Sequence, residues 1–273
     1  MLFFNYVAGN KMINALEKSS NLLKINRIPI INYINENKDN ALENFKEYTN
    51  LINNLDSRNV IALKLSSFDF DKKIIDNIIN SAIKNNIKII IDAEDKKNIH
   101  EYRLLTNELI YKYNSNKPNI YKTYQMYRTD SYNELKDDSI FFYQNNKILA
   151  TKLVRGAYYN AEKNEGHLFN YKGLTDNNYN HAVKFCYNNN LNYNIIASHN
   201  IDSILLACKL NKKKKVFTIA NLLGMNEYNM NKISKAYNIN LATYIPYGPY
   251  SNMLPYLTRR LYENLDQIKY FIR

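Results

Sequence analysis

Two adjacent arginines near the end of the chain, Arg259 and Arg260, have side chains well suited to bind a small anion. They stand in the segment 241–264, which reads as an apolar strand, a corner with two prolines and a glycine, and a helix. Neighbouring helical positions point about 100° apart, so both guanidinium forks reach one anion only if it lies over the helix edge. Glu263 is spaced to hold Arg259, and Tyr256 shares the face of the pair. The alternative is a solvated basic helix with one salt bridge.

Other polar side chains stand where apolar segments end. Six of them are Lys64, Asp92, Gln125, Arg155, His199 and Tyr244. Each alone has an ordinary explanation, such as a lysine that extends to solvent, a helix-capping aspartate or a structural histidine. The active sites of parallel barrels form at the carboxyl ends of the strands. We therefore expect these six side chains to contribute to one site.

The elements that must position them alternate between short apolar runs and longer amphipathic stretches, as expected for repeated βα units. We predict strands near 28–34, 60–65, 87–92, 121–127, 148–154, 193–197, 216–220 and 241–245. Helical periodicity covers 74–84 and 41–55, where the expected apolar face is Leu42, Phe45, Tyr48, Leu51, Ile52 and Leu55. The pattern predicts an α/β fold, a (βα)8 TIM-type barrel with a short N-terminal helix over 12–23. We expect residues 1–273 to form one catalytic domain, with 156–179 as its longest irregular connection.

Composition excludes several classes of protein. A hydrophobic content of 45% is ample for a core, but no apolar run approaches the roughly 20 residues that span a bilayer. The first residues do not resemble a secretion signal, so we expect a protein that is not secreted. The two cysteines lack CxxC spacing and the four histidines lack paired spacing, so we expect a reduced compartment and no metal site. The net charge of +12 is spread along the chain without a nucleic-acid-binding motif, and we expect no nucleic-acid partner.

Eight short motifs, in this order, resemble those of the proline dehydrogenase family. They are YVAG (6–9), IALKLSS (61–67), IDAE (91–94), TYQMY (123–127), TKLVRGAYY (151–159), IIASHN (195–200), NLLGM (221–225) and YLTRRLYEN (256–264). The resemblance extends over nearly all 273 residues. It implies a flavoenzyme that oxidises L-proline to 1-pyrroline-5-carboxylate by hydride transfer to flavin N5.

The resemblance also implies a non-covalent FAD bound across the mouth of the barrel. No side chain accepts a hydride, so this oxidation requires a cofactor, and the six glycines form no GxGxxG dinucleotide motif. The residues that match flavin contacts are Ala93, Gln125, Lys152, Arg155, Gly156, Ala157, Ser198 and His199. Among them, Lys152 matches the catalytic cation near flavin N5, which favours negative charge on the reduced flavin.

For the substrate, the resemblance assigns the carboxylate to three cations, Lys64, Arg259 and Arg260, supported by Glu263. The catalytic-site residue Asp92 would orient Lys64 and Tyr244. The matching walls of the pyrrolidine ring are Leu222, Tyr244 and Tyr256. Two departures are Asn221, where Gln is more usual and which shortens one polar arm, and Tyr159, where some members have Trp.

The resemblance implies a quinone or another electron acceptor and peripheral membrane association. It implies the matrix side of the mitochondrial inner membrane in a eukaryote, and the cytoplasm or the membrane surface in a bacterium. One alternative is a barrel aldolase or Schiff-base enzyme with Lys64 or Lys152 as nucleophile. A second is a non-catalytic, basic nucleic-acid-binding protein.

Overall fold

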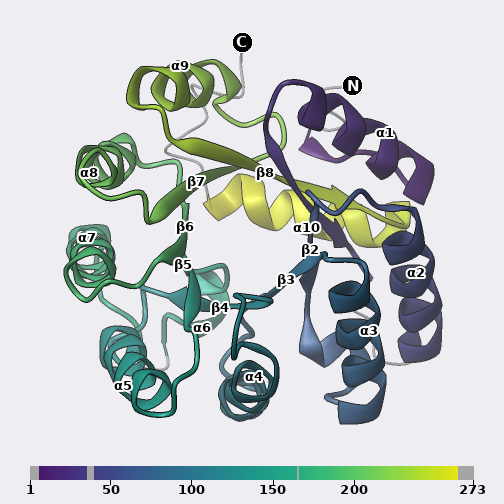
Figure 1. Ribbon diagram of the computed structural model, residues 1–273, viewed down its shortest axis with the longest axis horizontal. Helices are drawn as coiled ribbons and strands as arrows, with labels where there is room; N and C mark the ends of the chain where they lie inside the picture. The colour runs from purple at the N-terminus through teal and green to yellow at the C-terminus, as the bar shows by residue number, and fades with distance from the viewer. Residues whose placement is uncertain (1–5, 36–39, 165, 264–273) are drawn as a thin grey trace. The chain divides into compact units, whose positions relative to one another are not determined.

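The computed structural model describes residues 6–35, 40–164 and 166–263, except for the side chains at positions 254, 256 and 259–263 (Figure 1). Eight strands close into a parallel barrel in chain order. They are β1 (Ile28–Tyr33), β2 (Val60–Leu63), β3 (Lys88–Ile91), β4 (Ile120–Gln125), β5 (Ala150–Val154), β6 (Tyr193–Ala197), β7 (Phe217–Leu222) and β8 (Asn240–Tyr247). The predicted (βα)8 barrel is confirmed.

The helices follow the strands in the predicted alternation. They are α1 (Met12–Lys24), α2 (Ala41–Asn54), α3 (Lys72–Lys84), α4 (Ile99–Tyr113), α5 (Ser131–Gln144), α6 (Tyr159–Glu162), α7 (Lys172–Asn188), α8 (Ile201–Asn211), α9 (Glu227–Tyr237) and α10 (Tyr250–Glu263), with a 3-10 turn, η3 (Leu65–Phe68). The first helix, α1, precedes β1 as predicted, and it also contacts β1. Among the described residues, none of these helices is long and apolar enough to cross a membrane.

The chain divides into two compact units. The first comprises Met1–Glu94, Asn221–Glu227 and Ala242–Arg273, and the second comprises Asp95–Ala220 and Tyr228–Leu241. The first contains β1 to β3 and most of β8, and the second contains β4 to β6 and most of β7. A single catalytic domain over residues 1–273 stays a prediction.

Helix α3 shows how local sequence determines an element. Asp71 caps its first turn, where the carboxylate accepts the backbone N–H groups of Lys73 at 2.9 Å and Ile74 at 3.0 Å. One face of the helix is buried and consists of Ile75, Ile78, Ile79 and Ala82. These positions follow the helical period, which is why the sequence predicts this helix correctly.

The predicted apolar face of α2 is wrong at its first residue. Leu42 is 63% exposed, whereas Asn44 is fully buried. Asn44 and Leu42 lie about 200° apart around a helix, so they cannot share a face. The Asn44 amide donates to the carbonyl oxygens of Asn35 at 3.2 Å and Ser67 at 3.0 Å, so a polar residue outside the predicted apolar face is buried because it satisfies loop carbonyls.

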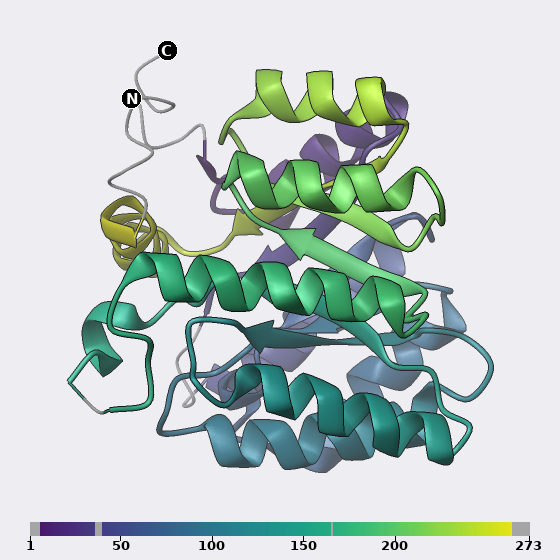
Figure 2. The same cartoon turned by 90° about the vertical axis from the view of Figure 1, so that its left-hand side faces the viewer.

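The connection after β5 is also more regular than predicted. It contains α6, and α7 begins at Lys172 and packs beside α8 (Figure 2). The segment between these helices is tied to the loop after β4, where the N–H of Thr129 donates to His167 at 3.0 Å and that of Phe169 donates to Tyr127 at 2.9 Å. The first turns of α7 are rich in polar residues, so apolar periodicity alone did not reveal them.

Candidate active site

In the first unit, Asp92 and Tyr244 are in direct contact. Asp92 directly follows β3, and its N–H donates to the carbonyl oxygen of Leu63 in β2 at 2.7 Å. Tyr244 lies in β8, and its hydroxyl donates to the Asp92 carboxylate. The structure therefore brings together two residues that are 152 positions apart in the sequence.

Lys64 stands at the carboxyl end of β2, where its ammonium Nζ lies 3.8 Å from Glu94 Oε2. The Glu94 side chain is fully buried. Its two oxygens accept the N–H and the hydroxyl of Ser66, each at 2.9 Å. The sequence analysis did not assign a role to Glu94. Its position as the last residue of IDAE, two residues after Asp92, was the available signal.

Helix α10 carries four of the predicted substrate residues, Tyr256, Arg259, Arg260 and Glu263, whose side chains lie outside the described part of the chain. Two other residues of the helix, Met253 and Leu257, pack in a buried cluster with Val7 and Ile34. This cluster anchors the predicted helix against the N-terminal segment. The substrate contacts of the four residues stay predictions.

In the second unit, Gln125 and Lys152 share one face of β4 and β5. Lys122 and Tyr124 both donate to Asp138 of α5, at 2.6 and 2.7 Å, so they face the surrounding helices. Side chains alternate along a strand, so Gln125 faces the barrel interior. Lys152 pairs with Thr123 of β4 and therefore has the same orientation. Both are buried, with Lys152 7% exposed.

The Arg155 guanidinium is held on three sides. It donates to Asp176 Oδ1 at 2.6 Å, to Ser203 Oγ at 2.9 Å and to the hydroxyl of Ser198. Its central carbon also lies 4.4 Å from the centre of the Tyr179 ring. Arg155 and Ser198, each predicted as a cofactor contact, are thus in contact with each other, while Asp176 and Ser203, which also bind the guanidinium group, were missed.

Gly156 lies against an aromatic ring. Its φ is +141°, and a Cβ at this position would come within 1.8 Å of the Tyr127 ring. The Tyr127 hydroxyl donates to Glu162 at 3.0 Å, and Arg128 donates to the same Glu162 oxygen at 2.8 Å. Burial and the nearby Glu162 carboxylate raise the pKa of the Tyr127 phenol. Glu162 therefore connects α6 to the end of β4, a role that the sequence analysis missed.

The remaining predicted residues lie at the ends of their strands. Leu222 is the last residue of β7, Ala93 follows Asp92, Ala157 follows Gly156, and His199 follows Ser198 after β6. Within the described ranges, no group of three or more His, Cys, Asp and Glu side chains is placed to hold a metal ion.

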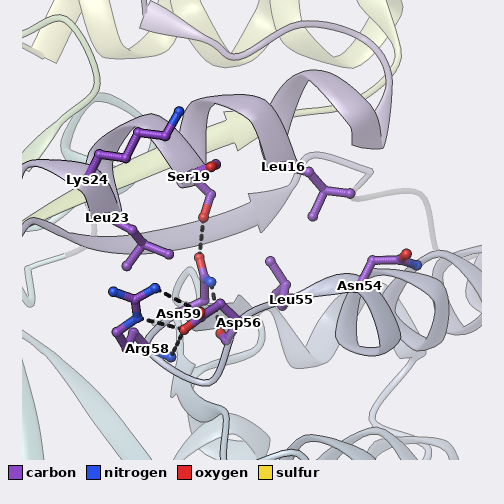
Figure 3. Close-up of a pocket in the computed structure, with 10 residues that line it drawn as sticks. Leu16, Ser19, Leu23, Lys24, Asn54, Leu55, Asp56, Arg58 and Asn59 are labelled. Carbon is purple, nitrogen blue, oxygen red and sulfur yellow. Dashed lines mark hydrogen bonds and ion pairs between the residues drawn. The ribbon is translucent and has the colours of Figure 1, made fainter.

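A cavity of about 340 Å³ lies elsewhere in the first unit, between α1 and the segment that joins α2 to β2 (Figure 3). Its polar lining is internally paired, with Ser19 bonded to Asn59 and Arg58 bonded to Asp56 at 2.8 Å. It opens at the amino end of β2, whereas Lys64 stands at the carboxyl end of that strand. This cavity is therefore separate from the candidate active site.

Buried ionic side chains at the carboxyl ends of barrel strands are characteristic of (βα)8-barrel enzymes. A sequence model of one such family, described as Proline dehydrogenase, matches residues 12–271. The chain belongs to the proline dehydrogenase family.

Individual relatives agree with this assignment. Mitochondrial proline dehydrogenase 1 of Dictyostelium discoideum is 33% identical over 211 residues, which are 69% of this chain and 36% of that protein. The human mitochondrial proline dehydrogenase 1 is 28% identical, over 71% of this chain and 35% of that protein. Proline utilization A from Bdellovibrio bacteriovorus, inactivated by N-propargylglycine, has a similar fold, with a TM-score of 0.86 and 20% identity over 96% of this chain and 32% of that one. The chain spans about a third of the length of these relatives.

Proposed function

We propose that this protein oxidises L-proline to 1-pyrroline-5-carboxylate with FAD as its cofactor, in proline catabolism. The observation that supports this most strongly is the family match over residues 12–271. The strand-end pairs Asp92–Tyr244 and Lys64–Glu94 and the buried Lys152 provide the ionic groups that such a reaction needs.

The residues of the second unit fit a flavin by their chemistry. FAD, when bound, supplies the acceptor for the hydride that leaves the carbon next to the proline nitrogen. Lys152 offers a buried cation and Gln125 an amide on the same barrel face. Gly156 adopts a φ of +141°, which a residue with a side chain rarely adopts, and lies against the Tyr127 ring. Arg155, Ser198, His199 and Ala157 complete the proposed cofactor contacts of this unit, and Ala93 is a proposed cofactor contact from the first unit.

The residues of the first unit bind and orient the substrate in this proposal. Lys64, Arg259 and Arg260 hold the proline carboxylate, and Glu263 supports Arg259. Asp92 accepts the hydrogen bond of the Tyr244 hydroxyl and so fixes the phenol ring. The carboxylates of Asp92 and Glu94 also favour a zwitterionic substrate, whose amino group is positive.

Leu222, Tyr244 and Tyr256 form the apolar walls of the ring pocket in this proposal. Such walls exclude water from the reacting carbon and hold the ring in one orientation, which lowers the entropic part of the barrier. The charged end of the molecule then determines which carbon faces the cofactor.

The test is direct. Purified protein reconstituted with FAD should show a flavin spectrum that bleaches when L-proline is added without an acceptor. Reoxidation by a quinone should restore the spectrum. Protein that takes up no FAD, or bound flavin that proline does not bleach, contradicts the proposal.

Two alternatives predict different results. A Schiff-base enzyme that uses Lys64 or Lys152 would form an imine with a carbonyl substrate, which borohydride traps as a stable mass increase on that lysine. A nucleic-acid-binding protein would bind tightly at low salt, with affinity that falls steeply as salt rises. We expect no trapped adduct and only weak, non-specific retention of nucleic acid.

We further propose that electrons leave to a quinone at a membrane surface. The eukaryotic relatives in Dictyostelium, Drosophila and human are named as mitochondrial proteins. The proposed location is therefore the matrix side of the mitochondrial inner membrane in a eukaryote, or the cytoplasm or membrane surface in a bacterium. Co-sedimentation with quinone-containing anionic vesicles would test the membrane association.

A further inference from the structure

A buried polar cluster surrounds Asn221, the next-to-last residue of β7. Its amide nitrogen donates to the carbonyl oxygens of Leu222 at 3.1 Å and Met225 at 2.9 Å, and to Glu227 Oε1 at 3.3 Å. Its amide oxygen accepts the hydroxyl of Thr243 at 3.0 Å. Asn221 is 2% exposed and Thr243 is fully buried. One side chain thus ties both ends of the turn after β7 to the neighbouring strand β8.

Glu227 and Arg27 complete this cluster. Glu227 begins α9, and its Oε1 also accepts the N–H of Gly224 at 3.1 Å. Its second carboxylate oxygen pairs with the guanidinium of Arg27, which is only 4% exposed. The same Arg27 nitrogen lies 3.3 Å from the Thr243 hydroxyl. The cluster therefore forms one connected network from the start of β1 to the start of α9.

Leu222 lies on the other face of this turn. Side chains alternate along a strand, so Asn221 and Leu222 point to opposite faces. In β8 the same alternation separates Thr243, which bonds to Asn221, from Tyr244, which bonds to Asp92. Leu222 therefore faces the same way as Tyr244. We expected the Asn221 side chain to be a polar group of the site, but it lies on the opposite face of β7, behind that site.

We propose that Asn221, Glu227 and Thr243 are positioning residues that hold Leu222 at a fixed depth and thereby select the ring size of the cyclic amino acid. The inference rests on the proposed function, which places Leu222 against the substrate ring. One methylene group changes affinity by about 10- to 200-fold in an apolar pocket. Discrimination of that size requires a pocket wall that does not move away to accommodate the larger ring. The network provides the rigid support behind Leu222.

The test uses two ligands that cannot be oxidised at a C–N bond, cyclopentanecarboxylate and cyclohexanecarboxylate. Their dissociation constants are measured by titration calorimetry on the FAD-loaded enzyme. We expect the wild-type protein to prefer the five-membered ring by about 10-fold or more. In Asn221→Ala, Glu227→Gln and Thr243→Val we expect this ratio to fall at least about threefold, chiefly through tighter binding of the larger ring.

Two controls separate positioning from general stability. Thr243→Ser keeps the hydroxyl and should retain the wild-type ratio, which gives a conservative partner for Thr243→Val. Glu43→Gln changes an exposed carboxylate of α2 and should also leave the ratio unchanged. Should the melting temperature of the Val variant fall while its ratio stays at the wild-type value, the network would be structural only, and the proposal would be refuted.

Failure of the proposed function gives a different result. In that case the wild-type protein would not oxidise proline, or neither ring carboxylate would bind competitively with it. An active enzyme with no preference between the two rings would overturn the ring-size inference alone.

Discussion

The fully buried carboxylate of Glu94 gives the sharpest quantitative prediction. It accepts two hydrogen bonds from Ser66 at 2.9 Å and lies 3.8 Å from the ammonium of Lys64. The change Glu94→Ala removes all three interactions at once. It leaves the Ser66 N–H and hydroxyl without this acceptor and the Lys64 charge without this counter-charge.

The expected loss can be worked out from these contacts. A buried donor left without an acceptor costs about 1–3 kcal/mol. Two unit charges at 3.8 Å attract by about 4 kcal/mol at an effective dielectric constant of 20, but burial of the carboxylate offsets much of this gain. Removal of one partner from a buried pair costs about 3–5 kcal/mol in total, and we expect that loss for Glu94→Ala. Glu94→Gln keeps an acceptor for Ser66 and should lose about half as much.

Thermal unfolding followed by circular dichroism measures the effect. At about 2–4 °C per kcal/mol for a domain of this size, Glu94→Ala should lower Tm by roughly 6–20 °C. The matched control Glu43→Ala, at an exposed position of α2, should stay within about 0.5 kcal/mol of wild type. The KM for proline should also rise in Glu94→Ala, because Lys64 loses a carboxylate that pairs with it. A Glu94→Ala protein within about 1 kcal/mol of wild type and with unchanged KM would refute this reasoning.

Four further predictions concern single residues. If Arg260 binds the proline carboxylate as proposed, Arg260→Ala should lower kcat/KM for proline by roughly 30-fold to several thousand-fold, since loss of one partner of such a pair costs about 2–5 kcal/mol. FAD content should stay near wild type, and wild-type kinetics would contradict the proposal. Gly156→Ala should lower FAD content, measured from the absorbance ratio, because the added methyl group overlaps the Tyr127 ring and φ is +141°. Lys122→Met should cost about 3–5 kcal/mol in urea unfolding, because it leaves the buried Asp138 carboxylate without its cation. Burial raises the pKa of the Cys186 thiol to about 12, so iodoacetamide at pH 9 should alkylate it only after unfolding. The contribution of this buried, protonated thiol to the free energy of unfolding is present below pH 9 and is lost as pH rises towards 12.

The barrel could be predicted because its strands and helices follow simple periods. The buried run of β2 and the apolar face of α3 both show the expected spacing. Barrel topology predicts that Asp92 and Tyr244 lie at the same end of the barrel, and the family resemblance implied that Asp92 orients Tyr244, which agrees with their hydrogen bond. Family resemblance then supplied the role of each residue, which periodicity does not contain.

The missed residues are those whose partners lie far away in the sequence. Glu94 looks like an ordinary polar residue after a strand until the fold brings Ser66, 28 positions away, against it. Glu162 joins α6 to Tyr127 across 35 positions, and Arg27 reaches Glu227 across 200. Hydrogen-bond geometry between distant segments has no local sequence period, so only the folded structure reveals it.

Charge balance in the first unit explains why the proposed arginine pair matters to function. The described strand-end side chains include one ammonium, that of Lys64, and two carboxylates, those of Asp92 and Glu94. These three groups carry a net charge of minus one, which repels the carboxylate of an incoming substrate. In the proposed site, the two guanidinium groups of Arg259 and Arg260 would offset this charge and that of Glu263, and each can form a bidentate pair. In this proposal a lysine at either position would keep the charge but not the planar fork, so Arg260→Lys should also weaken proline binding.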